Sequence, residues 1–129
     1  MKNEKDVKSK VKKLLDKHRY FWWMPPANGY GKGGISDFHA IKRGVFLSIE
    51  TKFGTNKPTA LQVGFLNSIR QEKGFAFVVS DRNIGWLETW LQAFDNAAEA
   101  VGDHRAVADQ DGADMLDALA ALTNFGETR

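Results

Sequence analysis

The sequence lacks cysteine and has no long apolar run in its 129 residues. The absence of cysteine excludes disulfides, thiol catalysis and cysteine-ligated zinc sites, and it makes a reducing compartment the natural one. No stretch approaches the roughly 18 apolar residues of a membrane span. Residues 1–13 are charged throughout, unlike the apolar core of a secretory signal. We therefore expect a cytoplasmic protein with no membrane partner.

The sequence does contain enough apolar residues for a folded core, since 43% are hydrophobic and 26% charged. The length fits one domain. Residues 1–80 carry 15 basic and 6 acidic residues, a net of +9, whereas residues 81–129 carry 3 and 10, a net of −7. This asymmetry is typical of a polyanion-binding body with an acidic appendage, although both parts can equally be solvated helical faces.

The spacing of apolar residues predicts helices and strands in alternation. We expect a helix over 4–19, whose apolar stripe repeats at helical spacing, and an aromatic strand over 20–24 that Pro25-Pro26 ends. A Gly-rich loop over 25–34 precedes the two strands of a hairpin, 35–41 and 45–52. The stripe of the first helix consists of Val7, Val11, Leu14 and Leu15.

The second half of the chain is expected to be mainly helical. Thr59 can N-cap a helix that runs to about Lys73, and a buried strand follows over 75–79. A further helix starts after Ser80 or Asp81, residues 102–112 break it, and a last helix covers 113–122. The expected fold class is therefore α/β, a small mixed β-sheet flanked by helices in the order αβββαβ, with added C-terminal helices. The inward residues of the Thr59 helix are Leu61, Phe65, Leu66 and Ile69.

A two-residue turn at Arg43-Gly44 would set the register of the hairpin. Lys42 then pairs with Val45, and Asp37 lies opposite Glu50 on the same face of the sheet. Opposed Cβ atoms lie about 4.5–5.5 Å apart in such pairs. Lys52 shares the face of Glu50 because it is two residues further on. A slip by one residue would separate the two carboxylates.

Two opposed carboxylates with a lysine on the same face are unfavourable unless a cation compensates them. Mg²⁺ prefers one or two carboxylates together with water and phosphate oxygens, and the backbone carbonyl of Thr51 would add a ligand. Lys52 would orient the attacking water or stabilise the phosphorus centre. The alternative is structural: Asp37 caps a turn, and Glu50 and Lys52 form an ion pair.

Four elements follow one another along the chain: Gly34-Ile35-Ser36-Asp37, Glu50-Thr51-Lys52, Gln62 and Gly74-Phe75. In this order they resemble the core of the PD-(D/E)xK nuclease superfamily, and more closely the small stand-alone VRR-NUC domains of phages. Ser36 stands where the superfamily name has proline. The resemblance implies a restriction-endonuclease-like core over 1–80, with 81–129 as a helical extension packed on or beside it.

The resemblance implies a metal-dependent, structure-selective DNA endonuclease of a bacterium or of a phage in its bacterial host. It would cleave phosphodiester bonds in branched DNA, such as four-way junctions or flaps, with Mg²⁺ or Mn²⁺ and as a homodimer. Asp37 and Glu50 would bind the metal, and Lys52 would serve the attacking water. Gln62 would steady that water or the phosphate, or only form a capping box with Thr59. Glu4 is either a further metal ligand or an exposed acid at a helix start.

The remaining candidates concern the nucleic acid and a second subunit. His39 is either a catalytic base or a half-buried strand histidine. Trp22 and Trp23 are candidates for stacking on bases, with one of them in the core. The basic and aromatic loop residues are phosphate contacts or only solvated charge, namely Tyr30, Lys32, Lys42, Arg43 and Lys57. Three later aromatics form a dimer surface or cover the sheet, namely Trp86, Trp90 and Phe94.

Two other classes of function compete with the enzyme. The first is a non-catalytic DNA-binding module that retains the nuclease fold, which would bind in a salt-sensitive way without turnover. The second is an interaction protein whose acidic tail, residues 102–129, covers its own basic face.

Overall fold

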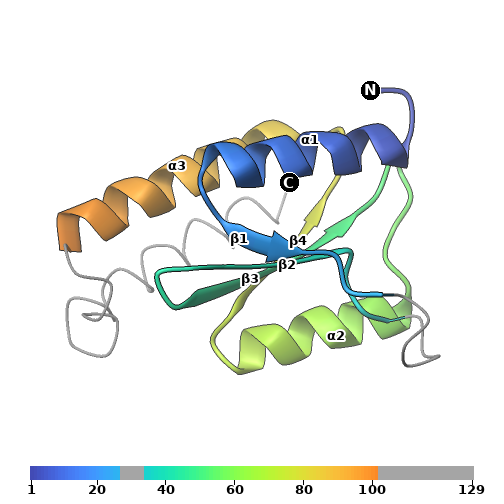
Figure 1. The fold of residues 1–129 in the computed structure, drawn as a ribbon. Helices are drawn as coiled ribbons and strands as arrows, with labels where there is room; N and C mark the ends of the chain where they lie inside the picture. The colour runs from blue at the N-terminus through green and yellow to red at the C-terminus, as the bar shows by residue number, and fades with distance from the viewer. Residues whose placement is uncertain (27–33, 102–129) are drawn as a thin grey trace.

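The computed structural model describes residues 1–26 and 34–101, which form an α/β fold of three layers. A mixed four-stranded sheet lies between helices α1 and α3 on one face and α2 on the other (Figure 1). The predicted order of helices and strands is confirmed over the described part. In chain order the elements are α1 (Glu4–Lys17), β1 (Phe21–Trp23), β2 (Phe38–Lys42), β3 (Val45–Thr51), α2 (Ala60–Gln71), β4 (Phe75–Val79) and α3 (Ile84–Val101).

The sheet has the strand order β1-β2-β3-β4, with the first three strands antiparallel and β4 parallel to β3. Lys42 pairs with Val45 and Phe38 with Ile49, so the predicted hairpin register is confirmed. Arg43 and Gly44 both have positive φ, 53° and 80°. This backbone is typical of the tight turns that match the twist of paired strands.

Strand β2 begins at Phe38 and not at residue 35 as predicted. Asp37 lies just before the strand because its carboxylate, and not its backbone, connects it to β3: it accepts hydrogen bonds from Thr51. A side-chain bond of this kind replaces ladder pairing at a strand end.

The main core lies between the sheet and the pair α1 and α3. The predicted stripe of α1 is buried, and α3 contributes four fully buried side chains to the same cluster, namely Leu87, Trp90, Leu91 and Phe94. Trp90 is fully buried, with its ring centroid 5.1 Å from that of Phe75 and 4.9 Å from that of Phe77. Trp90 and Phe94, with the partly buried Trp86, therefore cover the sheet, as one of the two alternatives predicts. Helix α3 starts later than predicted, at Ile84, because Ser80 and Asn83 form a hydrogen-bonded turn before it.

Helix α2 begins where the sequence predicts. Thr59 is its N-cap, and the capping box with Gln62 is present. Leu66 is buried, but Leu61 is 64% exposed, so the prediction that it faces inward is wrong. The first turn of α2 lies against Gly34 and not against the sheet, since a Cβ on Gly34 would meet the Leu61 backbone oxygen at 3.0 Å.

Several sequence-based predictions lie outside the described residues. These are the roles of Tyr30 and Lys32, the helix over 113–122 and the covering of a basic face by the acidic tail. Among the helices that the structure describes, none combines the length and apolar character that spanning a membrane requires.

Candidate active site

Three segments meet at one end of the sheet: the start of α1, the residue before β2 and the end of β3 (Figure 1). Asp37, Glu50 and Lys52 belong to this end, and the charge of Asp37 acts on the Glu50 carboxyl. The hairpin register explains this meeting, because Asp37 and Glu50 continue the pairing of Phe38 with Ile49 by one residue. The three side chains that the sequence singles out therefore converge.

Asp37 is held firmly by β3. Its Oδ2 atom accepts a hydrogen bond of 2.9 Å from the backbone N–H of Thr51 and one of 2.6 Å from the Thr51 hydroxyl. Its Oδ1 atom lies 3.6 Å from Nζ of Lys8. Thr51 is fully buried, so both bonds fix the carboxylate. Sequence reasoning assigned only the backbone carbonyl of Thr51 to the site and missed its side chain.

Glu50 is a buried acid whose charge is only partly compensated. It is 2% exposed, and its Oε2 atom lies 3.2 Å from Nζ of Lys52. Its Oε1 atom is buried and has no hydrogen-bond partner within residues 1–26 and 34–101. Burial, the nearby charge of Asp37 and the weaker charge of Glu4 raise the pKa of Glu50 to about 7, although Lys52 opposes the shift.

Helix α1 contributes two charged residues to this end of the sheet. Lys8 lies 3.5 Å from the Glu4 carboxylate, one helical turn away, and 3.6 Å from Asp37. Glu4 is thus close enough to affect the titration of Glu50. Sequence reasoning missed Lys8, although the spacing of Glu4 and Lys8 is the signal of an ion pair on a helix.

Gln62 acts in the capping box of α2. Its Oε1 atom accepts a hydrogen bond of 2.9 Å from the backbone N–H of Thr59, and its own N–H donates to the Thr59 hydroxyl at 3.2 Å. The capping alternative is therefore confirmed, while a contact with water or phosphate stays a prediction.

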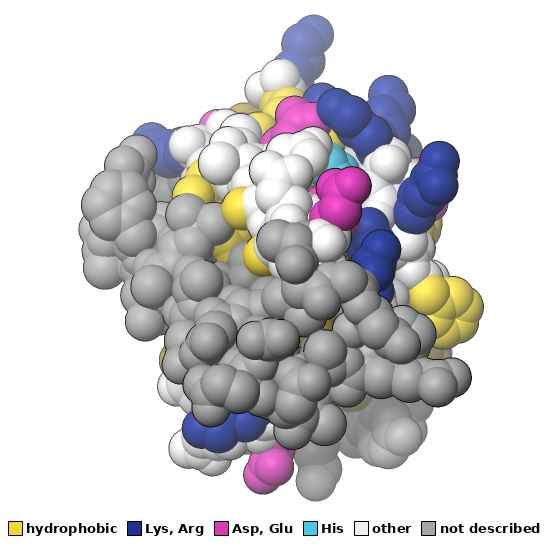
Figure 2. All heavy atoms as spheres, turned by 90° about the vertical axis from the view of Figure 1, so that its left-hand side faces the viewer, with side chains coloured by type: hydrophobic (Ala, Val, Ile, Leu, Met, Phe, Trp, Pro, Cys, Tyr) yellow, Lys and Arg dark blue, Asp and Glu magenta, His cyan; other side chains and the backbone are white. Residues whose placement is uncertain are grey.

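Lys42 and Arg43 lie at the hairpin turn, away from the carboxylates, and their contact with phosphate stays a prediction. Five strand residues, about 17 Å, separate this turn from Asp37. Lys42 forms an ion pair of 2.5 Å with Asp95. Figure 2 shows this end of the molecule, where Lys and Arg side chains gather beside a histidine and an acidic side chain. Lys57 is exposed in the loop that follows Lys52, seven residues after Glu50, and its contact with phosphate stays a prediction.

His39 packs among aromatic rings. Its ring is parallel to that of Phe65, with centroids 5.6 Å apart, and lies 5.6 Å from Trp23 and 5.4 Å from Phe46. Burial lowers the pKa of His39 below its ordinary value. This packing favours the half-buried strand histidine over a catalytic base. Trp22 donates a hydrogen bond to Asp16 and packs on Phe38, whereas Trp23 is 40% exposed.

Asp37 and Glu50 can bind a divalent cation, but the described protein groups alone do not complete its coordination shell. In the described part of the chain, no group of three or more His, Asp or Glu residues is arranged to hold a metal ion. Mg²⁺ in proteins needs only one or two carboxylates when water and phosphate oxygens complete its shell. The buried Oε1 atom of Glu50, beside a second carboxylate, is an oxygen donor that suits such an ion.

Comparison of the chain with protein-family models and with curated proteins finds no match among either.

Proposed function

We propose that the protein is a Mg²⁺- or Mn²⁺-dependent endonuclease that hydrolyses phosphodiester bonds in branched DNA, with a restriction-endonuclease-like core. The observation that carries the proposal is the buried Glu50 carboxylate beside Asp37, with one oxygen that has no partner in the described residues. The mixed α/β sheet agrees with such a core. The resemblance of the Asp37, Glu50-Thr51-Lys52 and Gln62 elements to VRR-NUC nucleases supports the assignment.

The contacts that a purely structural role predicts are present as well, but they leave one oxygen of Glu50 without a hydrogen bond among the described residues. Thr51 binds Asp37, and Lys52 pairs with Glu50. A purely structural ion pair is favourable only when its remaining oxygens also have hydrogen bonds. Glu50 Oε1 has none among the described residues, and a buried acceptor left in this way destabilises a fold by about 1–3 kcal/mol. Such a cost is typical of a site that binds a cation or substrate.

The residues have distinct parts in this proposal. Asp37 and Glu50 would hold the ion, and Thr51 keeps the Asp37 carboxylate in place. When bound, the ion would neutralise negative charge on the phosphate and would make a bound water more acidic. Lys52, 3.2 Å from Glu50, presents an ammonium group that can donate a hydrogen bond to the attacking water or to a phosphate oxygen. A homodimer with two such sites would cut opposed strands of a junction.

The proposal is tested by cleavage of labelled four-way junctions, flaps and plain duplexes. The parent should cut branched DNA with Mn²⁺ or Mg²⁺ and not with a chelator. Glu50→Gln and Lys52→Met should each lower the rate at least about 100-fold. The matched controls are Glu72→Gln and Lys12→Met, which change exposed residues far along the chain from the carboxylates. The mass in solution tests the homodimer.

Equal cleavage by the parent and by both site variants would show that the site assignment is wrong. Salt-sensitive DNA binding without metal-dependent turnover would instead support the non-catalytic binding module.

A further inference from the structure

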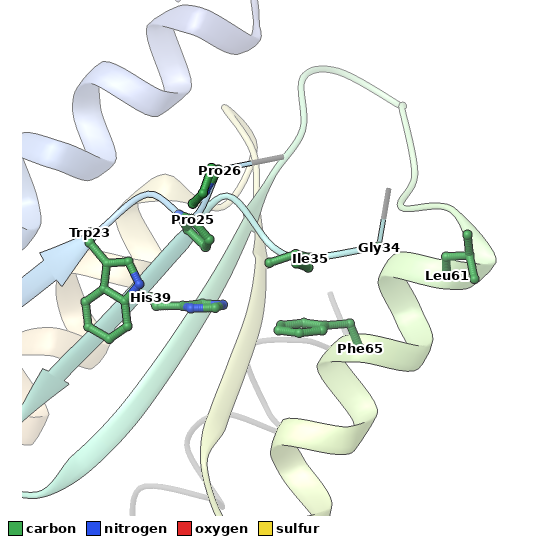
Figure 3. A pocket seen from close by; sticks show the side chains of 8 residues that line it. All are labelled: Trp23, Pro25, Pro26, Gly34, Ile35, His39, Leu61 and Phe65. Atoms are coloured by element: carbon green, nitrogen blue, oxygen red, sulfur yellow. The ribbon is translucent and has the colours of Figure 1, made fainter. Parts of the chain in front are cut away.

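A pocket opens on the α2 face of the sheet, with Trp23 and His39 on one side and Leu61 and Phe65 of α2 on the other (Figure 3). Its volume is about 700 Å³, within the usual range for small-molecule sites. Side chains from β1, β2 and α2 and from the segment before β2 line it, and almost all of the lining is apolar. The residues that matter here are Trp23, Ile35, His39, Leu61 and Phe65.

The pocket lies close to the proposed site because both include strand β2 and the segment before it. His39 follows Asp37 by two residues, and its partner Ser48 precedes Glu50 by two residues. Residues two apart along the chain lie at most about 7 Å apart, so Asp37 is close to both Ile35 and His39 of the pocket lining. A phosphate at the carboxylates would therefore place its own nucleotide within reach of the pocket.

The walls of the pocket suit a flat heterocycle. The Phe65 and His39 rings are parallel to within 4°, and the Trp23 ring stands at 87° to His39. The Nε2 atom of His39 is buried and has no hydrogen-bond partner in the part of the chain that the structure describes. An alkyl chain would leave this nitrogen unpaired, whereas the edge of a nucleobase can bind it.

We propose that this pocket binds an unpaired nucleobase of the DNA strand whose phosphate lies at Asp37 and Glu50. The inference rests on the proposed function and narrows its substrates to single-stranded flaps, ends and unpaired branches. A paired base would first have to leave its stack, so fully paired duplex is disfavoured. The exposed Trp23 and Leu61 form the open rim through which a base would enter.

The test measures DNA binding without cleavage. In a Lys52→Met background with chelator, a labelled single-stranded oligonucleotide and a duplex of equal length are titrated at one salt concentration. We expect Trp23→Ala to weaken single-strand binding roughly tenfold and to leave duplex binding unchanged, since base stacking is lost. The control is Phe21→Ala, which removes the 70% exposed aromatic of the same strand outside the pocket lining.

A second variant, His39→Phe, keeps the ring and removes the nitrogen. It should keep most of the single-strand affinity and reduce the differences among oligonucleotides of the four bases. Circular dichroism shows whether each variant is folded, and we expect Trp23→Ala to fold because Trp23 is 40% exposed on the edge strand β1.

The results separate the two proposals. If Trp23→Ala binds single strands as the parent does and His39→Phe keeps the parent's differences among the four bases, the pocket proposal is overturned, while metal-dependent cleavage by the parent still supports the endonuclease. If single-strand binding depends on Trp23 and the parent never cuts with metal, the pocket proposal stands and the endonuclease is rejected.

Discussion

At the scale of single residues, burial and the charge of Asp37 act on Glu50 against its ion pair with Lys52. The net result raises the pKa of Glu50 from 4.5 to about 7. Between these two pH values the folded protein binds more protons than the unfolded chain, so stability falls as the pH rises. The penalty is complete above pH 7 and absent below about pH 4.5. Its upper limit is on the order of 3 kcal/mol.

Glu50→Gln should therefore change stability in a pH-dependent way. Relative to the parent, the variant should gain about 1–3 kcal/mol in free energy of unfolding between pH 5 and pH 8, because the amide carries no charge. Urea unfolding at both pH values, with chelator present, measures the gain. Glu72→Gln, at an exposed position, should show no such trend.

Divalent cations extend this prediction. At pH 8, Mn²⁺ or Mg²⁺ should stabilise the parent by compensating Glu50, and should stabilise Glu50→Gln much less. A stability difference between parent and variant that is the same at every pH and with or without metal would contradict the prediction.

At the scale of elements, variants in the first turn of α2 distinguish the capping role of Gln62 from its proposed contact with water or phosphate. Thr59→Ala removes the cap that Thr59 offers to Gln62 N–H and should destabilise the protein by about 1 kcal/mol. Gln62→Ala removes the reciprocal bond to Thr59 N–H and should have a similar effect on stability. We expect only Gln62→Ala to lower DNA cleavage strongly at a temperature where both are folded. Parallel losses of activity in the two variants would leave Gln62 with the capping role alone.

The elements whose positions depend on local signals were predictable from the sequence. The α1 stripe, the Thr59 cap and the Arg43-Gly44 turn act over a few residues, and their predicted outcomes are confirmed. Leu61 was predicted wrongly because helical spacing does not show where a helix extends beyond the sheet.

The candidate site was predictable only in part. Asp37, Glu50 and Lys52 follow from the register, which the turn sets. The roles of the Thr51 hydroxyl and of Lys8 were not predicted, because their contacts with Asp37 join distant parts of the chain. Lys42 and Arg43 were candidates for phosphate contacts because they are close to the carboxylates in sequence, whereas the antiparallel strands place the turn at the opposite end of the hairpin.

At the scale of the whole molecule, α3 shares the buried cluster of α1 and the sheet. Trp90 lies between Phe75, Phe77 and Phe94 and is fully buried. Trp90→Ala should lower the free energy of unfolding by about 3–5 kcal/mol. Because α3 and the strands bury the same surface, far-UV circular dichroism and tryptophan fluorescence should report one coincident unfolding transition of the parent.

Two separate transitions of the parent would show instead that residues 84–101 unfold independently of the core over 1–80. The matched control is Leu61→Ala, which truncates an exposed side chain and should change stability by less than about 0.5 kcal/mol.

The turn at Arg43-Gly44 has a consequence for how this chain tolerates change. Strand side chains alternate between faces, so inserting or deleting one residue there would shift the pairing and turn Asp37 away from Glu50. Substitutions at the turn that keep its backbone are harmless to that arrangement, but a change in length is not. A single-codon gain or loss at this turn, about five strand residues away from Asp37, would thus separate the two carboxylates while leaving both of them unmutated.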